Sequence, residues 1–376
     1  MSKILFISES IRRDNHSPLR LFRDFEVIHL YLNAPYGDMS KENLRGAKQV
    51  TLGGLYGAII KENPDFIQGT EPFGSRLSLR LAYISLKAAN HLKAKLIVPI
   101  LENRPISERF NLVQRAALRA FCPKYFERAD RVVALNDGAQ RNIKHYCKEA
   151  KIVRNLIWGV WGVDLDLFHA KGEKILGRIV YVGRFVEEKG IRFLLEGFAM
   201  AVKEDSSLSL DLVGSGELEG EIKSFISENK LQDKIDLVGF VKNEELPKYF
   251  SRAELNVYPS VTEKRWEEQV GTVNLQAMAC STPTLTTKSG AIPEYIKDGE
   301  GAILTDERSA EAISKAILKF FSDLELRQKL TQGARQAAVK YDIKGEVEKA
   351  EKLLNSLTGS DPCKSARVRP SHRNRL

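Results

Sequence analysis

Residues 268–294 read EQVGTVNLQAMACSTPTLTTKSGAIPE, and this stretch decides the fold class. Its pattern predicts an apolar helix over 271–279, a strand over 284–287 that follows a proline, and another helix over 293–298 after a Gly-Ala-Ile-Pro-Glu turn. Short β-branched strands that alternate with helices are typical of βαβ units. The stretch therefore predicts a parallel sheet covered by helices.

The same alternation runs along the rest of the chain. It predicts an α/β protein of two doubly wound, Rossmann-like domains that face each other across a cleft, where ligands bind at the carboxyl ends of the strands. In the first half, strands are expected over 3–8, 27–32, 65–69, 95–101 and 131–135, and helices over 57–62, 77–92 and 107–129. In the second half, further strands are expected over 178–183, 209–214, 235–238 and 255–259, and further helices over 190–204, 218–229, 244–251, 310–321 and 345–357.

A connector over 158–173 separates the two halves, since it is rich in glycine and aromatic residues and has no regular pattern. We place the N-terminal domain at 1–160 and the C-terminal domain at 161–357, whose last helix could pack back on the first domain. A chain of 376 residues has the length of two such domains. Residues 358–376 show no apolar periodicity and are expected to be a disordered basic tail.

The tail contributes to the formal net charge of +9, because its last nineteen residues hold five lysines and arginines against one aspartate. Two interpretations stay open. The tail is either an expression-vector remnant that begins near Gly359 or a basic arm for anionic lipid or nucleic acid. We assign no function to it and expect no nucleic-acid partner.

Composition points to a cytoplasmic protein. The chain is 43% hydrophobic and 28% charged, and no run of 18 apolar residues could span a bilayer. The opening MSKILFISES predicts a first strand, because its apolar run is too short for a signal peptide. The four cysteines are scattered without a CxxC pair, as expected of free thiols in a reducing compartment.

The segment GRFVEEKG places Gly183 at the end of a strand, with Arg184 and Lys189 in the loop before a helix. Two cations at a helix N-terminus can bind a diphosphate, because backbone N–H groups and the helix dipole add to the side-chain charges. The alternative is a solvated surface turn.

A second glycine pair, Gly214 and Gly216, follows the strand SLDLVG. Glycines after a strand let the backbone approach a ligand closely. A nicotinamide-cofactor domain would need the full GxGxxG pattern, which is absent. An ordinary exit from a strand is the other interpretation.

Together these segments resemble glycosyltransferase family 4, a group of retaining enzymes of GT-B architecture. The resemblance covers residues 174–343 throughout and the first domain in outline. It implies a nucleoside-diphosphate sugar as the donor, bound mainly by the second domain, without a metal or other cofactor. It implies catalytic roles for Arg184 and Lys189 on the departing diphosphate and for Glu268 on the sugar hydroxyls. The remaining donor-binding residues that it implies are Gly183, Gly214, Gly216, Phe240, Gly271, Thr272, Val273, Gln276 and Glu294.

The chain departs from the family pattern at Gln276, where the family usually has a glutamate eight residues after the first. Glu267 could replace Glu268 in this register, but only Glu268 gives the seven-residue gap. A neutral hydrogen bond to the ribose is weaker than a charged one by about 1 kcal/mol, which weakens nucleotide binding several-fold. We therefore expect an altered donor affinity and an active enzyme.

The first domain matches the family more loosely. The usual Gly-Gly after the first strand is replaced by SESIRRDNHSP, and the loop after 95–101 offers Glu102 as a polar residue for the reaction centre. A helix-capping role for that loop is equally possible. Thr70 and Glu71 follow the predicted strand over 65–69, and this position alone would place them at the cleft.

Residues 107–129 mix arginines and a lysine with apolar side chains. A basic amphipathic helix here could contact an anionic membrane, which would suit a lipid-linked acceptor. A core-facing helix with a solvated basic face is the alternative.

The resulting prediction is a retaining glycosyltransferase that moves a hexosyl unit to a glycan, lipid-linked or small-molecule acceptor. The alternatives are a non-catalytic subunit that binds sugar nucleotides and a sugar-nucleotide epimerase of the same architecture.

Overall fold

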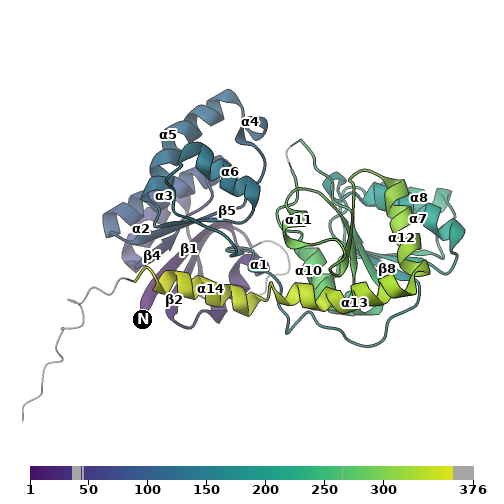
Figure 1. Cartoon of the computed structure of the whole chain (residues 1–376). Coiled ribbons are helices and arrows are strands. Elements are labelled where there is room, and N and C mark those ends of the chain that lie inside the picture. The colour runs from purple at the N-terminus through teal and green to yellow at the C-terminus, as the bar shows by residue number, and fades with distance from the viewer. Residues whose placement is uncertain (36–43, 45, 265, 359–376) are drawn as a thin grey trace, which may run out of the picture.

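The computed structural model describes residues 1–35, 44, 46–264 and 266–358. It consists of two α/β domains that lie side by side (Figure 1). Each contains one parallel sheet between layers of helices, so the predicted fold class is confirmed. Apart from Thr358, the predicted tail lies outside the described residues.

The first sheet has the strand order β3-β2-β1-β4-β5-β6-β7. Such an order changes direction between β1 and β4, the position where doubly wound sheets bind ligands. Its strands are β1 (Ser2–Ser10), β2 (Phe25–Asn33), β3 (Ala47–Gln49), β4 (Phe66–Gln68), β5 (Lys95–Ile100), β6 (Arg131–Ala134) and β7 (Ile152–Val153). Its helices are α1 (Arg13–His16), the 3₁₀ turn η1 (Ser17–Leu21), α2 (Leu52–Glu62), α3 (Arg76–Leu92), α4 (Ile106–Arg109), α5 (Leu112–Arg128) and α6 (Asp137–Tyr146).

The second sheet has the order β10-β9-β8-β11-β12-β13. Its strands are β8 (Arg178–Val182), β9 (Ser209–Val213), β10 (Ile235–Gly239), β11 (Leu255–Tyr258), β12 (Thr284–Thr287) and β13 (Ala302–Thr305). Its helices are the 3₁₀ turn η3 (Glu187–Lys189), α7 (Ile191–Glu204), α8 (Glu219–Glu228), α9 (Leu246–Arg252), α10 (Thr272–Ala279), α11 (Ile292–Tyr295), α12 (Ala310–Ser322), α13 (Leu324–Val339) and α14 (Ile343–Asn355). The strands over 284–287 and 178–182 thus form where the β-branched runs predict them.

The prediction of a single helix over 107–129 is wrong. The chain forms α4 and α5 instead, because Phe110 is extended and Asn111 caps α5 by accepting the N–H of Gln114 at 2.9 Å. Helix α5 buries Leu118, Cys122, Tyr125 and Phe126, and it packs against α3 and α6. One face of α5 therefore packs on the core, and contact of its other face with a membrane stays a prediction.

Several other expectations need correction. Helix α2 begins at Leu52, five residues before the expected start, because the Thr51 hydroxyl caps it by accepting the N–H of Gly54. Helix α11 ends at Tyr295, before the expected 298. The sequence pattern missed α6, α13 and β13 altogether.

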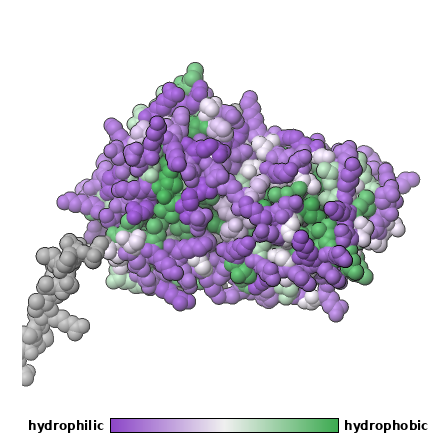
Figure 2. Space-filling model, in the orientation of Figure 1, coloured by the Kyte–Doolittle hydropathy of each residue, from purple (hydrophilic) through white to green (hydrophobic). Residues whose placement is uncertain are grey.

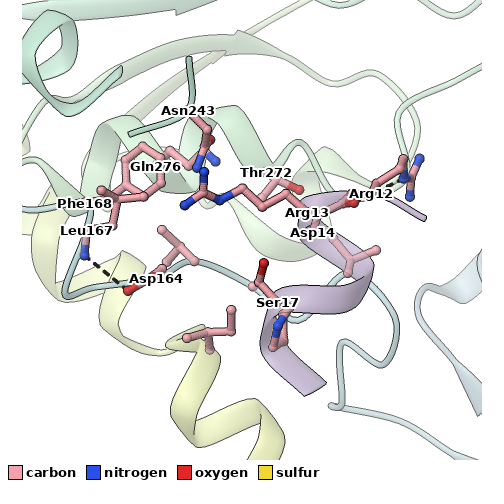
Figure 3. Close-up of a pocket in the computed structure, with 15 residues that line it drawn as sticks. Arg12, Arg13, Asp14, Ser17, Asp164, Leu167, Phe168, Asn243, Thr272 and Gln276 are labelled. Carbon is pink, nitrogen blue, oxygen red and sulfur yellow. Dashed lines mark hydrogen bonds and ion pairs between the residues drawn. The ribbon is translucent and has the colours of Figure 1, made fainter. Parts of the chain in front are cut away.

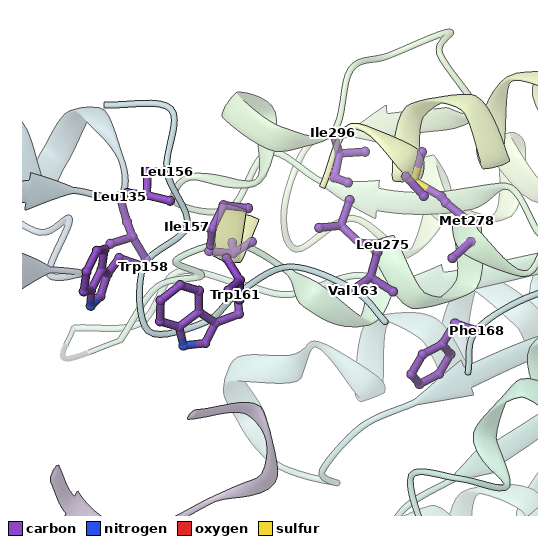
Figure 4. Packing of buried hydrophobic residues seen from close by; sticks show 14 of the residues in the cluster. Leu135, Leu156, Ile157, Trp158, Trp161, Val163, Phe168, Leu275, Met278 and Ile296 are labelled. Carbon is purple, nitrogen blue, oxygen red and sulfur yellow. The ribbon is translucent and has the colours of Figure 1, made fainter. Parts of the chain in front are cut away.

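The connector between the domains is packed. Trp158 and Trp161 are fully buried, and Figure 4 shows them in one cluster with Val163 and, from the second domain, Leu275 and Met278. The indole Nε1 of Trp158 donates to Gln68 at 2.8 Å. The segment therefore fixes the two domains against each other.

Helix α14 returns to the first domain, as Figure 1 shows. The buried carboxylate of Glu351 accepts the backbone N–H groups of Arg23 and Asp24 at 2.6 and 2.7 Å. Glu346, which is also buried, accepts the N–H of Ile157 in the connector at 2.7 Å. The C-terminal helix therefore ties the second domain to both the first domain and the connector.

Candidate functional site

Lys189 and Glu268, predicted from separate segments, form an ion pair at 2.9 Å. Their side chains are only 11% and 13% exposed, so solvent screens the pair weakly. The same carboxylate oxygen lies within hydrogen-bond distance of the hydroxyls of Ser260 and Tyr258, at 3.1 and 3.3 Å. Glu268, and not its neighbour Glu267, makes these contacts.

Aromatic rings enclose this pair. The Lys189 ammonium lies 4.2 Å from the ring centroid of Trp266 and 5.1 Å from that of Tyr258. Burial, followed by the nearby Glu268 carboxylate, raises the pKa of Tyr258 well above its ordinary value. Tyr258 therefore stays a neutral hydrogen-bond donor. Sequence reasoning missed it because a tyrosine at the end of an apolar strand carries no local signal.

Arg184 is more open. Its side chain is 56% exposed, and its guanidinium pairs with Glu188 at 3.0 Å. It lines a pocket of about 430 Å³ together with Gly183, Gly214 and Phe240. The Phe240 side chain is exposed, so it presents an apolar face to this pocket.

Close backbone packing explains the two glycines, Gly214 and Gly216, near this pocket. Gly214 has φ of +146°, and a Cβ there would overlap the carbonyl oxygen of Gly183. A Cβ at Gly216 would overlap the backbone of Phe185. The two strand exits therefore stack directly on each other, and Gly216 contributes to this packing without being among the pocket's lining residues.

A second pocket, of about 280 Å³, lies between the domains (Figure 3). Thr272 and Gln276 of α10 line it, with Asn243 shared with the first pocket. The two pockets therefore adjoin. Arg13 extends from the first domain toward Gln276 and Asn243 in Figure 3, and its guanidinium also forms an ion pair with Glu244. Sequence reasoning did not predict this contact.

Helix α10 begins without a side-chain cap. Its N-cap residue, Gly271, has φ of +75°, a conformation that favours glycine. Thr272 and Val273 then occupy the first turn, where backbone N–H groups point out of the helix. This end of α10 can bind an anion.

Glu294 lies at another domain contact. Its carboxylate accepts the N–H of Asp137 at the start of α6 and pairs with Arg154 at 3.1 Å. Its donor-binding role stays a prediction, and in this structure it joins α11 to the first domain.

Glu102 is buried, and its carboxylate has partners within the first domain. It forms an ion pair with Arg109 and accepts the N–H of Arg104 at 3.0 Å. The Glu71 carboxylate accepts the N–H groups of Leu101 and Glu102. Burial raises the pKa of Glu71 to about 7, although the hydrogen bond from the Leu101 N–H opposes this shift. These contacts are those of a loop-fixing cluster, while the predicted catalytic role of Glu102 stays a prediction.

The loop after Glu102 touches the reaction-centre candidates. The Asn103 amide donates to the backbone carbonyl of Glu268 at 2.9 Å. The structure thus brings Lys189, Glu268, Arg184 and the start of α10 to the domain cleft, although they come from separate segments. Within the described residues, no group of three His, Cys, Asp or Glu side chains could hold a metal.

The profile "Glycosyl transferases group 1" matches residues 169–337. This match lies within the second domain, which therefore resembles the family. The group 1 match spans the ion pair of Lys189 and Glu268, the lining of the Arg184 pocket and the start of α10, with Thr272 and Gln276 of the interdomain pocket.

Known proteins resemble the whole chain in fold and parts of it in sequence. An uncharacterized glycosyltransferase of Methanocaldococcus jannaschii is 25% identical over 71% of this chain and 71% of its own length. The amylovoran biosynthesis glycosyltransferase of Erwinia amylovora is 28% identical over 42% of this chain and only 40% of that protein. The crystal structure of HepE from Anabaena in complex with UDP has a TM-score of 0.76 at 15% identity and covers 95% of this chain and 100% of that one.

Proposed function

We propose that this protein is a retaining glycosyltransferase of family 4 that transfers a hexosyl unit from a nucleoside-diphosphate sugar to a glycan, lipid-linked or small-molecule acceptor. The observation that carries this proposal is the partly buried pair of Lys189 and Glu268 beside the uncapped start of α10. A cation and a helix start suit a diphosphate, and a carboxylate suits sugar hydroxyls.

In the proposed reaction, the acceptor oxygen bonds to the anomeric carbon on the face from which the diphosphate departs. The bond between that carbon and the phosphate oxygen breaks. Lys189, Arg184 and the first N–H groups of α10 stabilise the charge on the departing diphosphate. A departing phosphate oxygen takes the acceptor's proton, so no side-chain base is required.

The donor would occupy the two adjoining pockets. We place the base against Phe240 and the exit of β10, the ribose near Gln276, and the diphosphate between Arg184 and Thr272. The fold neighbour HepE has been crystallised with UDP-glucose, with a TM-score of 0.72 to this chain, which supports uridine diphosphate sugars as the first donors to examine.

The direct test is a thermal-shift screen of nucleoside-diphosphate sugars with the purified chain. A donor present at 100 times its Kd stabilises the folded state by about 2.7 kcal/mol, so the right donor raises Tm clearly. Lys189→Ala should abolish that shift. If no sugar nucleotide raises Tm, the proposal is wrong.

Transfer and hydrolysis assays separate the rival functions. A non-catalytic subunit would bind the donor without turnover, and an epimerase would convert the donor with no acceptor present. Neither rival is favoured by the group 1 match.

We propose that cationic side chains replace a metal ion at the diphosphate. Lys189 and Arg184 both follow β8, and Arg184 lines the pocket where we place the donor. Activity after treatment with EDTA should equal that of the untreated protein. A loss of activity that Mg²⁺ restores would contradict this part of the mechanism.

We also propose a cytoplasmic location, with acceptors reached at the inner membrane surface. None of the described helices is long and apolar enough to cross a membrane. Leu112 and Val113 at the start of α5 are exposed, and an apolar groove includes Tyr83 and Phe121. Figure 2 shows hydrophobic surface on the first domain where α3 lies. Binding to anionic vesicles that Leu112→Ser weakens would support contact through 107–129.

A further inference from the structure

A cationic pocket of about 270 Å³ lies in the first domain, apart from the two donor pockets. Arg115 and Arg119 of α5 line it on one side, and Arg141 and His145 of α6 on the other. Asn103 of the cleft loop completes the wall. Helices α4 and α6 lie on the side of the first domain that faces the second domain (Figure 1).

None of the three arginines is ion-paired with a carboxylate in the described part of the chain. Among the described residues, none of the three guanidinium groups forms an ion pair or hydrogen bond, and the Nε of Arg115 is buried without a partner. Arg109 and Arg128 of the same domain are both paired with carboxylates. Arg119 and Arg141 are exposed, but a buried donor without a partner costs free energy, and an anionic ligand at the Arg115 Nε would offset that cost.

The pocket borders the proposed reaction centre. Asn103 lines it and donates to the carbonyl of Glu268, whose carboxylate holds Lys189. Burial raises the pKa of Glu267, and Arg141 is close enough for its charge to lower that pKa in turn. A ligand held by Arg141 would therefore lie beside the 267–268 segment.

We propose that this pocket binds a phosphate group of the acceptor, an inference that rests on the proposed transferase function. A guanidinium matches two phosphate oxygens with parallel N–H donors, and three arginines suit a dianion better than a singly charged carboxylate. A neutral sugar would leave the charges uncompensated. An acceptor anchored here can extend a hydroxyl past Asn103 toward Glu268.

Calorimetry with the full chain tests this inference without a donor. The probes are glucose 6-phosphate, glucuronate and glucose, with UDP as a separate probe of the donor site. Glucose 6-phosphate should bind about tenfold or more tightly than either other sugar, which corresponds to about 1.4 kcal/mol. Binding of glucose 6-phosphate no tighter than glucose or glucuronate would overturn the proposal.

Variants assign the binding to the pocket. The double variant Arg115→Gln/Arg119→Gln should lose about tenfold in affinity for glucose 6-phosphate and keep its affinity for UDP, which also shows that it is folded. Arg80→Gln, an exposed arginine on α3 outside the pocket, is the matched control and should change neither. Unchanged phosphate binding in the double variant would overturn the proposal.

A second arm distinguishes the source of the phosphate. Phosphatidylcholine vesicles with and without phosphatidic acid report a lipid phosphomonoester, and competition by glucose 6-phosphate reports a soluble one. Vesicle binding and competition by glucose 6-phosphate each support binding at this pocket if the double variant Arg115→Gln/Arg119→Gln no longer shows them. A failure of UDP to bind the wild-type chain would count against the transferase function, whereas a failure of glucose 6-phosphate alone counts against this pocket.

Discussion

At the scale of single residues, the two candidate cations of the site have different ion-pair partners. Lys189 is paired with the partly buried Glu268 carboxylate, whereas Arg184 is exposed and forms an ion pair with Glu188. An exposed pair contributes little stability, so a diphosphate can displace Glu188 from Arg184 easily. Contact between Arg184 and the proposed leaving group would therefore cost little free energy.

Replacing Arg184 tests this assignment. Arg184→Ala should lower kcat/KM by about 10²-fold, because one charged contact to the transition state is removed. Its exposure predicts that Tm changes little. Steady-state kinetics with the identified donor measures the effect, and a kcat/KM within twofold of wild type would remove Arg184 from the mechanism.

Gln276 lies where the ribose is placed, with Arg13 extending toward it. Gln276→Glu should tighten donor binding several-fold, because a charged acceptor is worth about 1 kcal/mol more to a ribose hydroxyl. Turnover should stay nearly unchanged, since the ribose is remote from the bond that breaks. Calorimetry and kcat provide the two readings, and a large rise in kcat would contradict this placement.

At the scale of elements, buried polar groups within strands set the response to pH. His29 of β2 is 2% exposed and lies between the Ser8 hydroxyl, 2.8 Å away, and the ring of His16, 3.0 Å away. Burial, with the neighbouring His16 charge, lowers the pKa of His29 to about 3. The folded first domain therefore holds His29 neutral.

His29 should make the protein sensitive to acid. Because its folded pKa lies below its unfolded value of 6.5, its contribution is complete above pH 6.5 and is lost as pH falls toward 3. The free energy of unfolding should fall by about 1.4 kcal/mol per pH unit below 6.5. His29→Gln should flatten this slope in urea denaturation at a series of pH values, and an identical slope in both proteins would contradict the assignment.

At the scale of the whole molecule, the domains are joined by polar contacts and by the buried connector. The sequence anticipated a connector at 158–173, but its two tryptophans pack into the core. Helix α14 adds the buried Glu351 across to the turn before β2. These contacts therefore fix the relative position of the two domains and so the cleft that carries the candidate site.

Removing the Glu351 carboxylate should weaken the contact between α14 and the first domain. Glu351→Ala leaves the N–H groups of Arg23 and Asp24 without their acceptor, at a cost of about 1–3 kcal/mol in the free energy of unfolding. Glu348→Ala changes an exposed residue on the same helix and should have almost no effect. Thermal or urea denaturation compares the two, and equal stabilities would show that α14 docks without Glu351.

The parallel sheets, most of the strands and the residues of the group 1 segment could be predicted from the sequence alone, because they depend on local periodicity and on glycines at strand exits. The folded chain was needed to show that Glu268 meets Lys189, that Arg13 extends toward Gln276, and that α4 and α5 are separate. It alone brought Arg115, Arg119 and Arg141 to one pocket. The physical reason is that these contacts join segments far apart in the chain, so no local pattern encodes them.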